Sequence, residues 1–74
     1  MRTVSHNGFE LMADKALGCH AVRECDRWML FDSSQMAGPT EAKTIAWLKW
    51  KVDEHWRMVE GMAEAESEAL AAWA

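Results

Sequence analysis

The stretch Ile45-Ala-Trp-Leu-Lys-Trp-Lys-Val-Asp-Glu-His-Trp56 holds three of the five tryptophans of this 74-residue chain. At about 100° per residue, a helix gathers one set of its apolar side chains into a stripe roughly 80° wide, the width of a face that packs on a core. The members of this stripe are Ile45, Leu48, Val52, Trp56 and Val59. The stretch therefore predicts an amphipathic helix that packs on another element.

Trp47 and Trp50 fall outside this stripe and are predicted to lie on the far side of the helix. Residues three apart are neighbours on a helix surface, so the two indoles form one outward patch. Exposed paired indoles favour a binding surface, because Trp is enriched at interface hot spots. The alternative is that they lie along the stems of Lys51 and Glu54, or under the chain's own loop.

The helix is predicted to begin at Thr40, which follows Pro39 and is a good N-cap, with Glu41 near the positive end of the helix dipole. No later proline stops it before Trp73. A helix of this length spans about 48 Å, whereas a compact domain of this size is about 30 Å across. Either the helix breaks near Gly61, or its last turns project from the domain.

The first half of the chain is predicted to form strands. Asn7-Gly8 is the strongest short-range signal for a two-residue type I′ hairpin turn. Residues 15–18 form the next turn, and Asp26-Arg27 is predicted to form a third tight turn. The expected strands are residues 2–6, 9–14, 19–25 and 28–33.

The first hairpin is amphipathic, because Val4, Phe9 and Leu11 share one face when His6 lies opposite Phe9. The second hairpin is apolar on both faces. Its two predicted sets are Val22, Met29 and Phe31 on one face, and Cys25, Trp28 and Leu30 on the other. One helix covers only one face of a sheet, so the sequence predicts more apolar surface than a single copy buries.

The predicted fold class is α+β: an antiparallel β-meander of three to four strands, in ββββα order, packed on one long C-terminal helix. We expect a single domain over residues 1–74. It comprises a meander over 1–33, a loop over 34–39 and a helix over 40–73, with the possible break near Gly61.

Composition limits the function. The formal net charge is −4, and binding to nucleic-acid phosphates requires a surplus of Lys and Arg. The sequence has no apolar run of about 18 residues and no signal-peptide pattern, so we expect a cytoplasmic protein with no membrane span. Cys19 and Cys25 are too far apart on one strand for a disulfide, and we expect both to be reduced thiols.

No residue pattern in the sequence predicts a catalytic site or a metal site. His6, Cys19, His20 and Cys25 match no zinc-ligand spacing. His55 directly follows Asp53 and Glu54, but neighbours in a helix diverge and do not converge on a substrate. We therefore expect no catalytic residues, no metal and no cofactor.

The chain resembles two classes of known proteins, one in layout and the other in general character. Over roughly residues 9–50, the meander ending in WMLFDSS and followed by TEAKTIAWL resembles the DNA-binding arm domains of phage-type integrases, which lay a basic sheet on DNA. Here the resemblance extends to layout only, since acidic residues outnumber basic ones over residues 1–40. In size, acidity and lack of motif, the chain is also similar to small phage and mobile-element inhibitors such as anti-CRISPR proteins.

The sequence therefore predicts a small acidic protein-binding module that is not an enzyme. It is expected to be a homodimer and to act as an inhibitor by occupying a surface of a larger host complex. The predicted binding residues are the apolar anchors and a set of C-terminal acidic residues: Trp47, Trp50, Trp28, Leu30, Glu64, Glu66 and Glu68. The alternative is a nucleic-acid-binding domain that uses Arg23, Arg27 and Trp28 on the sheet.

Overall fold

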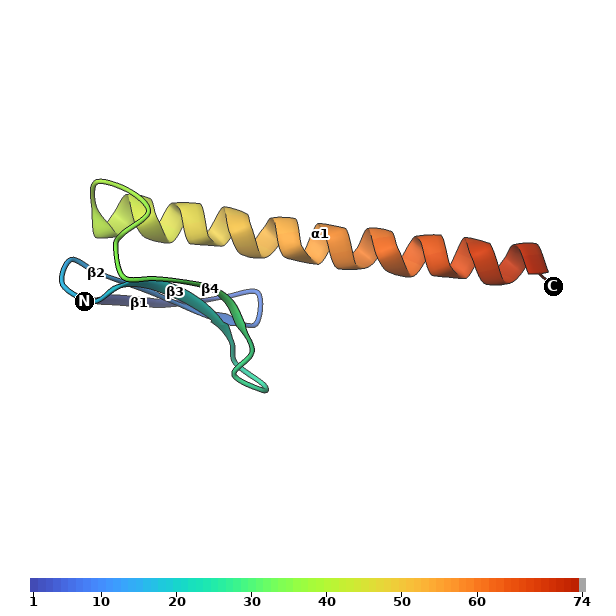
Figure 1. Cartoon of the computed structure of the whole chain (residues 1–74), viewed down its shortest axis with the longest axis horizontal. Coiled ribbons are helices and arrows are strands. Elements are labelled where there is room, and N and C mark those ends of the chain that lie inside the picture. Colours follow the sequence, from blue (N-terminus) through green and yellow to red (C-terminus); the bar gives the residue numbers. More distant parts are fainter. Residues whose placement is uncertain (74) are drawn as a thin grey trace.

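The computed structural model describes the backbone of residues 1–73 and the side chains of residues 1–60. Four strands form one antiparallel sheet in the order β1-β2-β3-β4, and a single helix, α1, packs on one face of it (Figure 1). The elements are β1 (Arg2–His6), β2 (Phe9–Asp14), β3 (Gly18–Arg23), β4 (Met29–Ser33) and α1 (Glu41–Trp73). The predicted α+β fold in ββββα order is confirmed.

The β1–β2 turn has the predicted conformation. Asn7 and Gly8 have φ angles of 48° and 82°, which a type I′ turn requires at its two central positions. The strands pair as expected, with His6 opposite Phe9 and Val4 opposite Leu11. This register places Phe9 and Leu11 on the face that α1 covers.

The β3–β4 connection differs from the prediction of a two-residue turn at Asp26-Arg27. β3 ends at Arg23 and β4 begins at Met29, so residues 24–28 form a longer loop. Within the loop, the Arg23 N–H donates to the Trp28 carbonyl at 2.7 Å and Arg27 has a φ of 60°. A short turn needs residues that readily adopt positive φ at both centres, and Asp-Arg without glycine supplies only one such position here.

A β-bulge changes which side chains of β4 face the helix. Ala21 pairs with Phe31 whereas Val22 pairs with Met29, so Leu30 is the extra residue. Both Leu30 and Phe31 pack against the core cluster. The prediction that they lie on opposite faces is therefore wrong, because the bulge interrupts the alternation of side chains along the strand.

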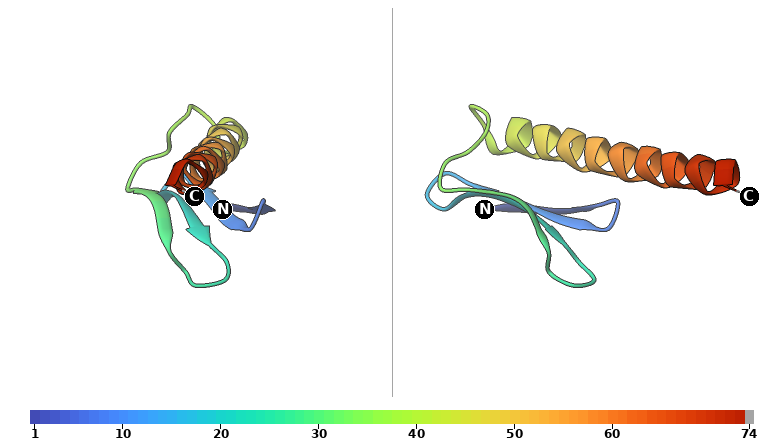
Figure 2. Two further views of the ribbon diagram at one scale, coloured as in Figure 1. Left: turned by 90° about the vertical axis from the view of Figure 1, so that its right-hand side faces the viewer. Right: turned by 45° about the vertical axis from the view of Figure 1, so that its right-hand side comes forward.

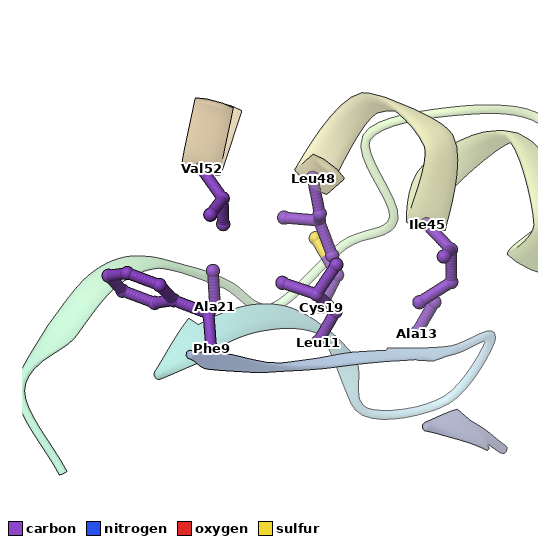
Figure 3. Close-up of a cluster of buried hydrophobic side chains, with 8 residues drawn as sticks. All are labelled: Phe9, Leu11, Ala13, Cys19, Ala21, Ile45, Leu48 and Val52. Atoms are coloured by element: carbon purple, nitrogen blue, oxygen red, sulfur yellow. The ribbon is translucent and has the colours of Figure 1, made fainter. Parts of the chain in front are cut away.

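The core lies between α1 and the inner face of the sheet (Figure 3). Ile45, Leu48 and Val52 point from α1 toward the strands, as the helical stripe predicts. The strand side of the cluster consists of Phe9, Leu11, Ala13, Cys19 and Ala21. Trp56 is partly buried at the edge of this cluster, and Val59 is exposed because α1 has passed the end of the sheet.

Thr40 caps α1 as predicted. Its hydroxyl accepts the N–H of Lys43 at 3.1 Å. Thr44, which is fully buried, donates its hydroxyl to the Thr40 carbonyl and accepts the Gly38 N–H. These bonds fix the direction in which α1 leaves the loop and crosses the sheet.

α1 continues through Gly61 to Trp73 without a break, so its C-terminal half projects past the sheet (Figure 2). The molecule measures 54 × 23 × 18 Å and has a radius of gyration of 15.5 Å, against about 11 Å for a compact chain of this length. Within the part of the chain that the structure describes, no helix is long and apolar enough to cross a membrane.

Candidate protein-binding groove

An aromatic cluster lies where α1 leaves the sheet. The His55 ring is at its centre, with ring-centroid distances of 5.7 Å to Phe9, 5.4 Å to Trp28 and 5.1 Å to Trp56. The Arg23 guanidinium lies 5.1 Å from the centre of the Trp28 ring. The cluster therefore joins the helix, the start of β2 and the β3–β4 loop through aromatic contacts.

Three hollows surround this cluster. One lies between α1 and β4, has a volume of about 270 Å³ and is lined by Leu30, Lys51, Glu54, His55 and Met58. A second, of about 500 Å³, is lined by Trp56, Gly8 and residues 23–25. A third, of about 410 Å³, is lined by Asn7, Trp56 and Glu60.

We call the first hollow, together with the adjoining Trp28 ring, the α1–β4 groove. Met58 is 64% exposed and Trp28 is 43% exposed, so the groove presents large apolar side chains to solvent. The β3–β4 hairpin bends away from α1 at this end of the sheet (Figure 1). Large apolar side chains in a concave site are typical of binding surfaces.

On the opposite flank of α1, polar contacts hold the helix to the β1–β2 turn. The Asp53 carboxylate is 2.9 Å from His6 Nε2 and accepts the Asn7 side-chain N–H at 2.7 Å. The Trp56 indole N–H donates to the Asn7 carbonyl at 2.9 Å. Hydrogen bonds from His6 and then Asn7 hold the pKa of the Asp53 carboxyl below its usual value of 3.8.

This contact predicts a specific acid sensitivity. Because the Asp53 pKa is lower in the folded than in the unfolded chain, its contribution is present above about pH 4 and is lost as the pH falls through the folded-state pKa. We expect Asp53→Asn to lower the melting temperature by a few degrees at about pH 6 and to change it little at about pH 2. Thermal melts followed by circular dichroism measure both values.

Asp32→Asn is the matched control, because Asp32 is an exposed carboxylate on β4 that makes none of the described hydrogen bonds. It should leave the melting temperature unchanged at both pH values. If Asp53→Asn and Asp32→Asn gave the same pH profile, the carboxylate would not hold the β1–β2 turn against α1.

The two arginines near Trp28 form ion pairs with carboxylates of the same chain. Arg23 donates to both carboxylate oxygens of Asp26 at 2.9 and 2.6 Å, and Arg27 donates to Glu10 at 2.9 Å. The Arg23 hydrogen bonds hold the pKa of the Asp26 carboxyl well below its usual range. Both guanidinium groups predicted to contact nucleic acid are therefore engaged by carboxylates of the same chain.

The structure separates the predicted binding residues. Trp28 and Leu30 line or adjoin the α1–β4 groove. Trp50 is 52% exposed on the outward side of α1, as predicted. Glu64, Glu66 and Glu68 lie outside the residues whose side chains the structure describes.

Trp47 is not part of an outward patch with Trp50, which corrects the prediction. It is partly buried against the core cluster, with its ring 4.9 Å from Phe31 in an edge-to-face contact. The fourth strand widens the sheet on this side, so Phe31 reaches a flank of α1 that would be exposed over a narrower sheet. Lys51 Nζ lies 5.7 Å from the Trp47 ring, which places Trp47 beside the groove.

Sequence reasoning missed three groove residues, Lys51, His55 and Met58. Together with Trp47 they follow one flank of α1 at spacings of three and four residues, which is the signal that could have identified them. The bulge at Leu30, which lets the Leu30 side chain pack against the core cluster, left no such signal.

The residues considered for metal binding or catalysis do not converge. Cys19 is buried in the core and Cys25 is exposed in the β3–β4 loop, and both are free thiols as predicted. Among the described residues no group of three His, Cys, Asp or Glu side chains is placed to hold a metal ion. The described hydrogen bonds of the His6 side chain lead to Asp53 and Asn7 and to no serine or cysteine.

Comparison of the chain with protein-family models, with curated protein sequences and with solved structures gives no match.

Proposed function

We propose that this protein is a non-enzymatic protein-binding module and that the α1–β4 groove is its binding surface. The observation that supports this function best is the groove itself. Its exposed Met58 and Trp28 flank the partly buried Leu30 beside an aromatic cluster. A rigid aromatic wall with apolar anchors is the kind of surface on which interface hot spots form.

The groove suits a protein better than a nucleic acid. A nucleic-acid site needs free cationic groups for phosphates, and Arg23 and Arg27 both bind carboxylates. Its apolar side chains instead match an apolar segment of a polypeptide, and Lys51 and Glu54 at its rim supply charges of both signs. The homodimer predicted from the sequence is one form of this function, and an inhibitor that covers a host complex in the cytoplasm is another.

The proposal is tested by placing a photo-crosslinking amino acid at position 58, in the groove, in the full-length chain. We expect a covalent adduct with a second polypeptide of one discrete mass, either from the purified protein or from an extract of its own cells. Excess wild-type protein should suppress the adduct, because it competes for the same partner surface. The Trp28→Ser variant should compete poorly, since it lacks the exposed wall of the groove.

The control places the same crosslinker at Thr3, which is exposed on β1 and pairs with Met12 on the sheet face away from α1. It should give no discrete adduct. If position 58 gave no adduct, or gave the same products as position 3, the groove would not be a protein-binding surface. Circular dichroism of each variant verifies that the fold is retained.

A further inference from the structure

We propose that the occupant of the α1–β4 groove is α1 of a second copy of this chain, lying antiparallel to the first. Each projecting helix would cover the β4 side of the other copy's sheet. This inference rests on the proposed function and names its partner. Coverage, length, residue spacing and charge support it.

The first argument is the coverage of the sheet. Strands lie about 4.8 Å apart and a helix is about 10 Å wide, so the face of a four-stranded sheet has room for two helices side by side. α1 packs mainly on β2, with β1 and β3 on either side, and makes far less contact with β4. The space beside α1 above β4 is where the groove and the Trp28 ring lie.

The second argument is length. The longest strands have six residues and span about 20 Å. α1 covers its own sheet up to Trp56, and residues 58–73 extend about 24 Å beyond it at about 1.5 Å per residue. The projecting segment therefore has the length needed to cross one sheet of the same protein.

The third argument is the spacing of apolar and small residues in the projecting segment, which form one stripe, or seam, along the helix. Beginning at the exposed Met58, apolar and small residues recur at alternating spacings of four and three, the spacing of helices packed along a common seam. These positions are Met58, Met62, Ala65, Ala69 and Ala72.

Antiparallel pairing that sets Met58 beside its equivalent brings the small residues of this seam opposite large ones. Ala65 falls beside Lys51 and Ala69 beside Trp47 of the second copy. Small residues opposite large ones allow two helices to approach closely.

The fourth argument is charge. After Arg57 the chain carries four glutamates and no lysine or arginine. In the antiparallel pairing, the segment containing Glu64 and Glu68 runs past Lys51, a cation that lines the groove. In a parallel pairing, the acidic segments of the two copies would lie side by side and repel each other. Charge therefore favours the antiparallel arrangement.

Sedimentation equilibrium on the purified full-length chain tests this inference. We expect a species of twice the chain mass of 8.4 kDa. Lys51→Glu should weaken the dimer about tenfold or more. The new glutamate would repel the acidic segment of the other copy, and the two-fold axis places this contact at two sites in the dimer. Arg2→Glu makes the same change of charge at an exposed position on β1, the edge strand farthest from β4, and should leave the dissociation constant unchanged.

A charge swap makes the test specific. The double variant Glu64→Lys, Glu68→Lys should also dimerise poorly with itself. Mixed with the Lys51→Glu chain, it should restore dimers of near wild-type affinity, because both symmetry-related contacts are then attractive. Failure of the mixture to associate better than either variant alone would overturn the antiparallel arrangement.

The outcomes separate this inference from the proposed function. A purified chain that sediments as a monomer at all concentrations overturns the second copy as occupant. The proposed function then still stands if the crosslinker at position 58 captures one discrete, competable partner from the cell extract. A dimer equally sensitive to Lys51→Glu and Arg2→Glu would place the contact elsewhere and also overturn the inference.

Discussion

Gly18→Ala is expected to leave the protein largely unfolded at room temperature. Gly18 opens β3 with a φ of 95°, a conformation that costs an L-residue about 1–2 kcal/mol. A methyl group there would also collide with the backbone carbonyl oxygen of Ser33 and lie 2.6 Å from the carbonyl carbon of Ser34. Backbone atoms cannot rotate aside as a flexible side chain can, so β4 would have to separate from β3.

The expected loss is large relative to the total stability. A domain of this size has only a few kcal/mol of net stability, and backbone strain together with a backbone collision consumes most of it. Urea titration followed by circular dichroism measures the change. A Gly18→Ala protein with a cooperative transition near that of the wild type would show that the β2–β3 turn and β4 can shift at little cost.

Gly8→Ala separates the conformational strain of a positive φ from the collision with backbone atoms. Gly8 also has a positive φ, of 82°, but a methyl group there would meet nothing within 4 Å. Its substitution should therefore cost only the conformational strain, about 1–2 kcal/mol. The difference in unfolding free energy between the two alanine variants then measures the collision with β4.

Local sequence signals predicted much of the fold. Asn7-Gly8 fixed the first hairpin and its register, because few residues other than Asn and Gly tolerate positive φ at adjacent positions. The stripe through Ile45, Leu48 and Val52 identified the buried face of α1. Thr40 marked its start through the capping bond to Lys43.

The groove was harder to predict, because it depends on two features that are not local in sequence. The bulge at Leu30 is a property of how β4 pairs with β3, and no turn residue marks it. The burial of Trp47 depends on Phe31, sixteen positions away in another element. Helical spacing alone placed Trp47 with Trp50 because it takes no account of the width of the opposing surface.

Leu48→Ala is expected to lower the free energy of unfolding by about 2–5 kcal/mol, the range observed for buried Leu to Ala changes. Leu48 is fully buried at the centre of the face that α1 turns to the sheet (Figure 3). Among the described side chains of α1, the buried ones are confined to positions 44–52, because Val59 already lies past the end of the sheet. Few other contacts can therefore compensate for the cavity.

Leu17→Ala is the matched control, because it makes the same chemical change at a side chain that is exposed in the β2–β3 turn. It should change the free energy of unfolding by less than about 0.5 kcal/mol. Chemical denaturation of both variants at low protein concentration measures folding of the isolated chain. If the two variants were destabilised equally, the helix–sheet contact would not be the main source of stability, and α1 would be held to the sheet chiefly by the polar contacts of Asp53 and Trp56.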